Sequence, residues 1–339
     1  MTKQSPPDRW VVFRLGHLGD VALTTGPLAR WGETRGLRFA YVTRASLSPL
    51  LRGHPAVDEN EIVGLDESVL HGTAWIAEAR RLAERFRGWG LLDLHGTLRS
   101  RILAHFWKGP VQRYPKHCLT RRIYRRTRSR RLGERLAATS VPQRYSLALE
   151  SAPPPNRELL PVIRLDDAER ETARRLLADR GLTGRLVALH PYATHPDKTW
   201  PREKWHNIMD QLTRVGYVPI IIGKDAEPLL PGSPSDLTGT TGLRGTCAIL
   251  ELAGVLVTGD SGPLHLASAV GTPVVALFGP TTRAWGFFPR GERDVVLERD
   301  LPCRPCSLHG AGGCARGRRC MTDIGEDEVL AAVERTMQS

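Results

Sequence analysis

Short apolar runs alternate with segments of helical periodicity along most of the chain. Three runs in the first half are short enough for buried parallel strands: residues 10–15, 38–42 and 91–94. Segments with helical spacing follow them: residues 21–31, 73–87 and 99–106. Because strands that alternate with helices form parallel sheets covered on both faces, the first half predicts an α/β domain.

The second half repeats this rhythm. Its predicted strands are residues 186–190, 218–222, 254–259 and 274–278, and its predicted helices include residues 167–180, 202–215 and 326–337. Between the halves, Pro153, Pro154 and Pro155 interrupt helix and strand alike and form a semi-rigid spacer. We therefore predict two Rossmann-like, doubly wound parallel-sheet domains in tandem, with a terminal helix: residues 1–152, 153–325 and 326–339.

The loops that follow strands are candidate sites, because open parallel sheets bind ligands beyond the carboxyl ends of their strands. The first such loop, residues 16–20, contains two glycines that allow a tight turn. Asp20 then lies near the start of the next helix, where the helix dipole favours its ionised form. Asp20 is either a carboxylate that serves as a general base or an ordinary helix cap.

Two loops of the second half carry candidate contacts to an anion. Lys198 lies just before a predicted helix start, where phosphates bind. Ser261 and Gly262 leave backbone N–H groups open at another helix N-terminus, and the preceding Asp260 can accept hydrogen bonds from sugar hydroxyls. His265 falls in the first turn of that helix. The structural alternatives are a solvated lysine, a capping aspartate and a buried core histidine.

The chain has 339 residues and a net charge of +12. This charge favours phosphates, anionic lipids or nucleic acid as partners, or it reflects an arginine-rich proteome. Arginine is concentrated in residues 121–131, which we expect to bind an anionic acceptor or membrane surface through Arg125, Arg126 and Arg128. No apolar run approaches the ~20 residues that span a bilayer, and residues 1–9 lack the apolar core of a signal peptide. We therefore expect a cytoplasmic protein, at most peripheral on the inner face of the cell membrane.

Four of the six cysteines cluster near the C-terminus: Cys303, Cys306, Cys314 and Cys320. Disulfides are uncommon in a reducing cytosol. The first two have the spacing of a metal knuckle, and four thiolates suit tetrahedral zinc or iron. We expect a structural metal site that fastens the loop before the final helix; the alternative is four reduced thiols or a disulfide.

Four stretches stand out together: RLGHLGDVALTTGPLARW, LHPYATHPDKTWP, VTGDSGPLHLASAVGTPVVALFGPT and LPCRPC…CARGRRCMTDIGEDEVLAAVE. In this order they resemble glycosyltransferase family 9, the ADP-heptose:lipopolysaccharide heptosyltransferases. The resemblance covers nearly the whole chain, and the third stretch is the most specific. It implies a GT-B fold, in which two Rossmann-like domains face a cleft, with the acceptor side N-terminal and the donor side C-terminal. It also implies that the last helix packs back on the first domain.

The resemblance implies an inverting transferase that moves heptose from ADP-heptose to a lipopolysaccharide core acceptor bearing Kdo or heptose, without a catalytic metal. Asp20 resembles the family's catalytic base, and Lys198 and Thr194 resemble its phosphate contacts. Glu227 resembles an acidic residue that holds the nucleotide ribose. The chain departs from the pattern at Ala193, where relatives often have a second hydroxyl residue, and in its cysteine cluster, which many lack. The donor-binding loop corresponds to Asp260, Ser261, Gly262 and His265.

Other functions stay open at this point. They are a GT-B epimerase of nucleotide sugars, a related transferase with another nucleotide sugar or acceptor, and a nucleic-acid-binding protein. Nucleic acid would bind the basic segment 121–131, but no binding motif accompanies it and aromatic residues make up only 6% of the chain. An acidic, phosphorylated lipid-linked acceptor explains the segment without nucleic acid, so we expect no nucleic-acid partner.

Overall fold

The computed structural model describes residues 7–338, which form two compact units. The first unit contains the chain up to Lys116 together with Pro142–Arg164. The second contains His117–Val141 and the chain from Leu165 onward. The backbone therefore passes between the units three times, where the sequence predicted a single linker. Most of the N-terminal segment examined for a signal peptide lies outside the described residues.

The first unit contains a five-stranded sheet in which all neighbouring strands are parallel, in the order β3-β2-β1-β4-β5. Its strands are β1 (Arg9–Phe13), β2 (Arg38–Arg44), β3 (Val57–Leu65), β4 (Gly90–Asp93) and β5 (Val111–Arg113). Its helices are α1 (Leu18–Arg35), α2 (Gly72–Arg85), α3 (Leu98–Phe106) and α6 (Val141–Ser146), with 3-10 turns η1 (Ser48–Leu51), η2 (Glu67–Leu70) and η3 (Asn156–Leu159). One core packs α2 and α3 against β1, β2 and β4.

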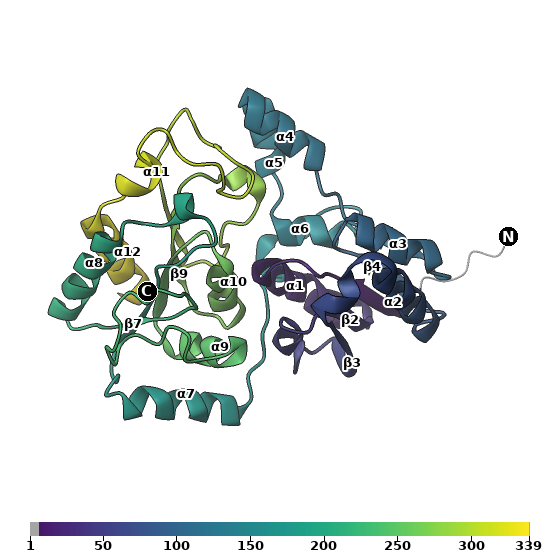
Figure 1. Ribbon diagram of the computed structural model, residues 1–339, viewed down its shortest axis with the longest axis horizontal. Coiled ribbons are helices and arrows are strands. Elements are labelled where there is room, and N and C mark those ends of the chain that lie inside the picture. Colours follow the sequence, from purple (N-terminus) through teal and green to yellow (C-terminus); the bar gives the residue numbers. More distant parts are fainter. Residues whose placement is uncertain (1–6, 339) are drawn as a thin grey trace. The chain divides into compact units, whose positions relative to one another are not determined.

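The second unit repeats this plan with the strand order β10-β9-β8-β6-β7, again all parallel. Its strands are β6 (Leu186–His190), β7 (Val218–Ile221), β8 (Val255–Gly259), β9 (Val274–Phe278) and β10 (Val295–Glu298). Its helices are α4 (Cys118–Thr127), α5 (Arg130–Ala137), α7 (Asp167–Asp179), α8 (Arg202–Arg214), α9 (Leu243–Leu252), α10 (Gly262–Ala269), α11 (Arg319–Thr322) and α12 (Glu326–Gln338), with 3-10 turns η4 (Pro196–Lys198) and η5 (Arg283–Trp285). Figure 1 shows α8 and α12 on one side of this sheet and α9 and α10 on the other. Over residues 7–338, no helix is both long enough and apolar enough to cross a membrane.

The predicted α/β alternation is confirmed in both halves. The structure adds three strands that the apolar pattern did not predict: β3, β5 and β10. All three lie at sheet edges. Edge strands are less buried than central ones. Accordingly, most side chains of β3 and β5 are exposed or half-buried. A short run of apolar residues therefore identifies the central strands and the buried edge strand β7, but not the more exposed edge strands β3 and β5.

The segment after the prolines belongs to the first unit, contrary to the predicted boundary at residue 153. The Val162 amide donates to the Thr25 hydroxyl at 2.8 Å. A Cβ at Gly26 would lie 2.3 Å from the carbonyl oxygen of Leu159, so only glycine allows α1 to approach this segment so closely. The crossover to the second unit therefore falls at Arg164–Leu165.

The arginine-rich hairpin of α4 and α5 groups with the second unit, whereas the sequence placed it in domain 1–152. Arg121 donates from Nη2 to the Trp285 carbonyl at 2.8 Å. The Tyr124 ring meets the Trp285 ring edge-on at 5.8 Å, and Leu136 is buried against Ala284 and Trp285. These partners lie about 150 residues away in sequence, so local pattern could not identify them.

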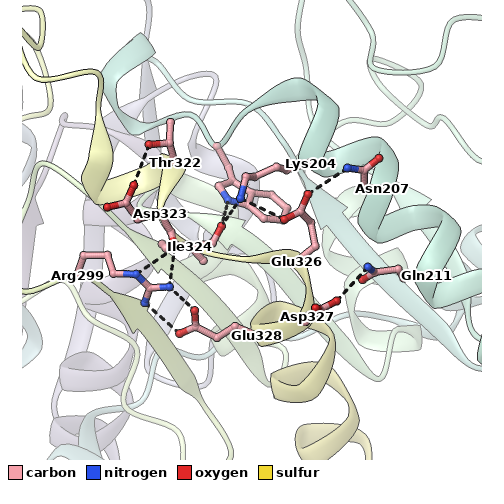
Figure 2. A network of polar contacts seen from close by, with 11 residues as sticks. Lys204, Asn207, Gln211, Arg299, Thr322, Asp323, Ile324, Glu326, Asp327 and Glu328 are labelled. Carbon is pink, nitrogen blue, oxygen red and sulfur yellow. Dashed lines mark hydrogen bonds and ion pairs between the residues drawn. The ribbon is translucent and has the colours of Figure 1, made fainter.

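The terminal helix α12 also packs within the second unit, where the resemblance placed it on the first domain. Its buried residues Val329, Ala332 and Val333 join the core formed with α8. Figure 2 shows the polar contacts at its start: Lys204 of α8 pairs with Glu326 at 3.1 Å and donates to the Ile324 carbonyl at 2.8 Å. Further contacts tie Asn207 to Glu326, Gln211 to Asp327, and Arg299 to Glu328.

Candidate active site

Asp20 lies in the first turn of α1, directly after β1, as the glycine-rich loop predicted. The residue at the N-cap position is His17, so Asp20 is not the cap of this helix. Its Oδ2 lies 2.5 Å from Arg14 Nη2, and the Tyr145 hydroxyl donates to its Oδ1 at 3.2 Å. Arg14 in turn donates to the Leu94 carbonyl at 2.7 Å, at the end of the neighbouring strand β4. The carboxylate is therefore held in a fixed position at the carboxyl edge of the first sheet.

The electrostatic surroundings keep Asp20 ionised. Burial by itself raises the pKa of this carboxyl, but the charge and hydrogen bond of Arg14 outweigh it, with smaller help from His17 and Tyr145, and the pKa falls below its usual value. Arg14 is buried as well, and Asp20 raises the pKa of its guanidinium against the opposing effect of burial. At neutral pH the pair is thus a fixed carboxylate beside a permanent cation.

His95 follows β4 and faces the same charged neighbourhood. Burial, then the positive charges of Arg14 and Lys116, lower the pKa of this histidine to about 3. Lys116 donates from Nζ to the His95 carbonyl at 2.9 Å. His95 is therefore neutral at physiological pH, and Arg14 and Lys116 supply positive charge beside it, which suits an anionic ligand.

In the second unit, the sheet order brings together loops that are far apart in sequence. Strands β6, β8 and β9 are neighbours, so the loops after them meet at one carboxyl edge. Lys198 Nζ lies 2.6 Å from Asp260 Oδ2, and the Thr281 hydroxyl donates to the same oxygen at 2.8 Å. Lys198 and Asp260, which the sequence proposed separately, thus form one ion pair at the start of α10.

Ser261 belongs to a second, buried polar cluster below this pair. Its hydroxyl lies 2.9 Å from the Thr258 hydroxyl and 3.2 Å from His190 Nδ1, and it makes no capping bond to α10. Burial lowers the pKa of His190 to about 4, against a small opposing effect of Asp225. Because Ser261 turns inward, the amides at the α10 N-terminus, where Gly262 is the first residue, are left to serve an anion.

The other predicted donor residues, Thr194, Glu227 and His265, differ in their exposure to solvent. Thr194 is exposed on the loop before η4, and Glu227 is exposed after β7, with its amide bonded to Asp225 Oδ1 at 3.0 Å. His265 is buried within α10, with its ring 6.2 Å from Phe287. The structure therefore pairs Lys198 with Asp260 next to the α10 N-terminus at Ser261 and Gly262, whereas Thr194 and Glu227 are exposed on other loops and His265 is buried within α10.

Sequence reasoning did not single out Arg14, Tyr145, His190 or Thr281 as site residues. Arg14, His190 and Thr281 all lie at or just after strand ends within the motifs that carry the resemblance, so their position was a usable signal. Tyr145 lies 125 residues from Asp20 and follows no strand, and only the folded first unit brings it to the carboxylate.

The cysteine-rich loop packs directly on the Lys198 loop. Arg318 donates from Nη1 to the Pro196 carbonyl at 2.8 Å and to the Thr199 hydroxyl at 3.0 Å. A Cβ on Gly310 would lie 2.6 Å from two carbons of the Lys198 side chain. Arg304 donates to the Thr281 carbonyl at 2.8 Å. The loop therefore supports Lys198. It also supports Thr281, whose hydroxyl donates to Asp260, the ion-pair partner of Lys198.

The four clustered cysteines are free thiols in the structure. Burial, followed by the proximity of Cys303, Cys320 and Cys314, raises the pKa of Cys306 to about 11. The four cysteines therefore lie near one another. Within residues 7–338, however, no three His, Cys, Asp or Glu side chains are arranged to hold a metal ion. The predicted ligand set is present without the closed geometry of a coordination site.

The three arginines expected to contact the acceptor lie on or next to α4. Arg125 and Arg126 are exposed on the helix, and Arg128 follows its last turn, with Nη2 3.3 Å from the Cys303 carbonyl. These residues therefore belong to the second unit and adjoin the cysteine-rich loop, whereas Asp20 belongs to the first.

Comparison with known proteins identifies the family to which the chain is similar. Residues 80–310, more than half of the chain, match glycosyltransferase family 9 (heptosyltransferase). Lipopolysaccharide heptosyltransferase 1 of Pseudomonas aeruginosa is 27% identical over 317 residues, covering 88% of this chain and 86% of that protein. Lipooligosaccharide heptosyltransferase 2 of two Campylobacter jejuni strains is 25–26% identical, and the chain spans about a third of the length of these relatives.

Solved structures share the fold across the full length. A glycosyl transferase family 9 protein from Veillonella parvula aligns with a TM-score of 0.76 at 21% identity, covering 99% of both chains. ADP-heptose lps heptosyltransferase II of E. coli aligns with a TM-score of 0.71 at 17% identity, covering 97% of this chain and 98% of that one. The two parallel-sheet units thus have the GT-B architecture of these neighbours. The chain belongs to glycosyltransferase family 9, the heptosyltransferase family.

Proposed function

We propose that this protein is an inverting heptosyltransferase that uses ADP-heptose and a lipopolysaccharide core acceptor bearing Kdo or heptose. The observation that carries the donor half is the Lys198–Asp260 pair at the start of α10. A fixed cation and open helix amides form a site for a diphosphate. The family membership and the names of its neighbours support ADP-heptose as the donor.

The proposed reaction assigns separate tasks to the two groups of residues. Asp20 takes the proton from an acceptor hydroxyl while that oxygen forms a bond to the anomeric carbon. The bond from this carbon to the diphosphate breaks on the opposite face, and ADP leaves with the electron pair. Lys198 and the α10 amides at Ser261–Gly262 stabilise the charge that grows on the leaving diphosphate. Inversion follows from attack opposite the leaving group, and no step requires a catalytic metal.

The remaining donor contacts complete this proposal. Thr194 supplies a hydroxyl to the diphosphate, and Glu227 holds the ribose hydroxyls. Asp260, oriented by Thr281, positions Lys198 and accepts from a donor hydroxyl, while His265 supports the loop from within α10. Exposure of Thr194 and Glu227 keeps both side chains accessible to a ligand.

A nucleotide panel tests the proposed donor class. We expect ADP to raise the melting temperature of the full-length protein more than UDP, GDP or CMP, because binding to the native state alone stabilises it. An oligonucleotide serves as the competing ligand. Preference for another nucleotide would favour the second candidate, a family-9-like transferase with a different donor. A response to the oligonucleotide alone would restore nucleic-acid binding and contradict the transferase proposal.

We propose that Arg125, Arg126 and Arg128 contact acidic groups of the acceptor at the cytoplasmic face of the membrane. Arginine suits bidentate recognition of phosphate and carboxylate. Replacing all three by glutamine should raise the KM for the acceptor by about a hundredfold, at roughly 1 kcal/mol for each lost contact, with unchanged affinity for ADP. Initial rates at varied acceptor concentration measure this effect, and an unaltered acceptor KM would contradict it.

We propose that Cys303, Cys306, Cys314 and Cys320 bind a structural zinc or iron ion. The chemistry of four thiolates fits either metal, but the thiols must close on the ion, because the loop as it stands does not form the site. Elemental analysis of untagged protein should give about one equivalent of metal. Because the loop supports Lys198, the Cys303→Ser/Cys306→Ser variant should also bind ADP more weakly. Less than about half an equivalent in wild type would count against the site.

A further inference from the structure

Helix α4 presents apolar side chains on the face that points away from its own unit. Arg121 and Tyr124 turn inward to Trp285, and both side chains are half-buried. Leu119 and Ile123 lie one turn apart on the other side, with 70% and 43% of their surface exposed. In a helix that merely faces water, polar residues occupy these positions. The outward face of α4 therefore carries apolar side chains where a helix on the surface of a soluble protein carries polar ones.

Basic residues lie along one flank of this apolar pair. Arg122, Arg125 and Arg126 are exposed, and the helical spacing places Arg122 and Arg126 beside Leu119 and Ile123. The helix contains no acidic residue. Long arginine side chains can lay their apolar stems along such a surface while their guanidinium groups reach phosphates. An apolar ridge flanked by arginines fits a surface that is itself apolar beneath a layer of anionic headgroups.

We propose that α4 docks the protein on an anionic lipid bilayer, with Leu119 and Ile123 inserted below the headgroups and Arg122, Arg125 and Arg126 on the phosphates. A lipid surface suits this helix better than an acidic protein does, because the outward pair is a ridge that projects into its partner. Such a ridge enters a fluid interface without a complementary groove. The proposal draws its biological reason, a lipid-linked acceptor, from the proposed function, but its test requires neither turnover nor nucleotide.

Vesicle flotation of the full-length protein tests this proposal. Wild type should float with vesicles of phosphatidylethanolamine and phosphatidylglycerol at low salt, and remain unbound with phosphatidylcholine alone. The Arg122→Gln/Arg125→Gln/Arg126→Gln variant should bind about a hundredfold more weakly, at roughly fivefold for each arginine. The Leu119→Ser/Ile123→Ser variant should lose at least about tenfold, because two partly inserted apolar side chains return to water.

Matched controls distinguish vesicle binding through α4 from a general effect of net charge or of exposed apolar side chains. Arg101, Arg174 and Arg214 are exposed on α3, α7 and α8, and their triple glutamine variant removes the same net charge. Leu98 is exposed to 73%, so Leu98→Ser removes a comparable apolar side chain from α3. Both controls should float like wild type. The substituted positions are on the surface, and circular dichroism and melting temperature confirm that all variants fold.

Several outcomes would overturn the membrane assignment. Wild type that ignores anionic vesicles, or an apolar variant that binds them as wild type does, would exclude insertion of α4. Binding to polyglutamate as tight as to vesicles, and insensitive to Leu119 and Ile123, would point to an acidic protein partner. Self-association that disappears in the Leu119→Ser/Ile123→Ser variant would instead identify α4 as a contact between copies. Failure of the nucleotide panel leaves this test intact, so the two proposals fail separately.

Discussion

Replacing Asp20 by asparagine should lower turnover by about 10²–10⁴-fold, the loss typical of a missing general base. A sugar hydroxyl is a weak nucleophile, and asparagine keeps the size of aspartate while it cannot accept the proton. The Lys198–Asp260 pair belongs to the other unit, so the affinity for ADP should stay near that of wild type. Steady-state rates together with calorimetric ADP binding measure the two quantities.

Loss of Asp20 also affects stability, because Arg14 remains buried without its counter-charge. Leaving one partner of a buried pair uncompensated costs on the order of a few kcal/mol. Thermal unfolding must therefore accompany the rates, and turnover is compared well below the melting temperature of the variant. Glu33→Gln is the matched control, since it removes an exposed carboxylate from the same helix. If folded Asp20→Asn kept more than about a tenth of wild-type turnover, the base assignment would fail.

The pH dependence follows from the lowered pKa of Asp20. A carboxyl whose pKa is lower in the folded than in the unfolded state stabilises the fold above its unfolded pKa of about 3.9. That contribution disappears as the pH falls through the folded pKa, so the loss belongs to strongly acidic conditions. Asp20 should accordingly produce no step in kcat/KM between about pH 5 and 9, and any step found there must come from another group.

Replacing Lys198 by alanine should weaken both donor binding and turnover. The diphosphate is already charged in the ground state, so the cation acts before as well as during bond cleavage. Removal of one preorganised electrostatic contact typically costs about 10²–10³-fold in rate. We expect the affinity for ADP to fall by roughly tenfold or more, as for a charge-assisted contact of about 1.5–3 kcal/mol. Asp20→Asn and Lys198→Ala are thus distinguished by ADP affinity, which only the second lowers.

Two further variants test whether the charge of Lys198 is responsible for the expected losses of ADP affinity and turnover. Lys198→Met keeps most of the aliphatic stem that packs against Gly310 but removes the ammonium group, and it should behave like Lys198→Ala. Arg214→Ala removes one exposed positive charge at the opposite end of α8 and should change neither quantity. A Lys198→Met variant with wild-type ADP affinity would mean that the side chain packs in the loop and does not hold the diphosphate.

The sequence determined the repeated α/β organisation and the loops in which the chemistry lies. Central strands such as β6 and β8 are buried on both faces, so they appear as continuous apolar runs. Asp20, Lys198 and Asp260 follow such strands, and parallel topology then places each of them at a carboxyl edge. Both steps depend on local periodicity and on a general property of parallel sheets, which is why sequence alone was sufficient.

Only the tertiary structure decided which side chains meet. The contacts of Asp20 with Tyr145, of Lys198 with Asp260, and of Arg121 with Trp285 span 62 to 164 residues. Tertiary packing likewise assigned α4 and α12 to the second unit. Periodicity shows that a helix has an apolar face, but not which of several apolar surfaces will cover it. That choice depends on shape and on the pairing of buried polar groups, and these arise only when distant segments pack together.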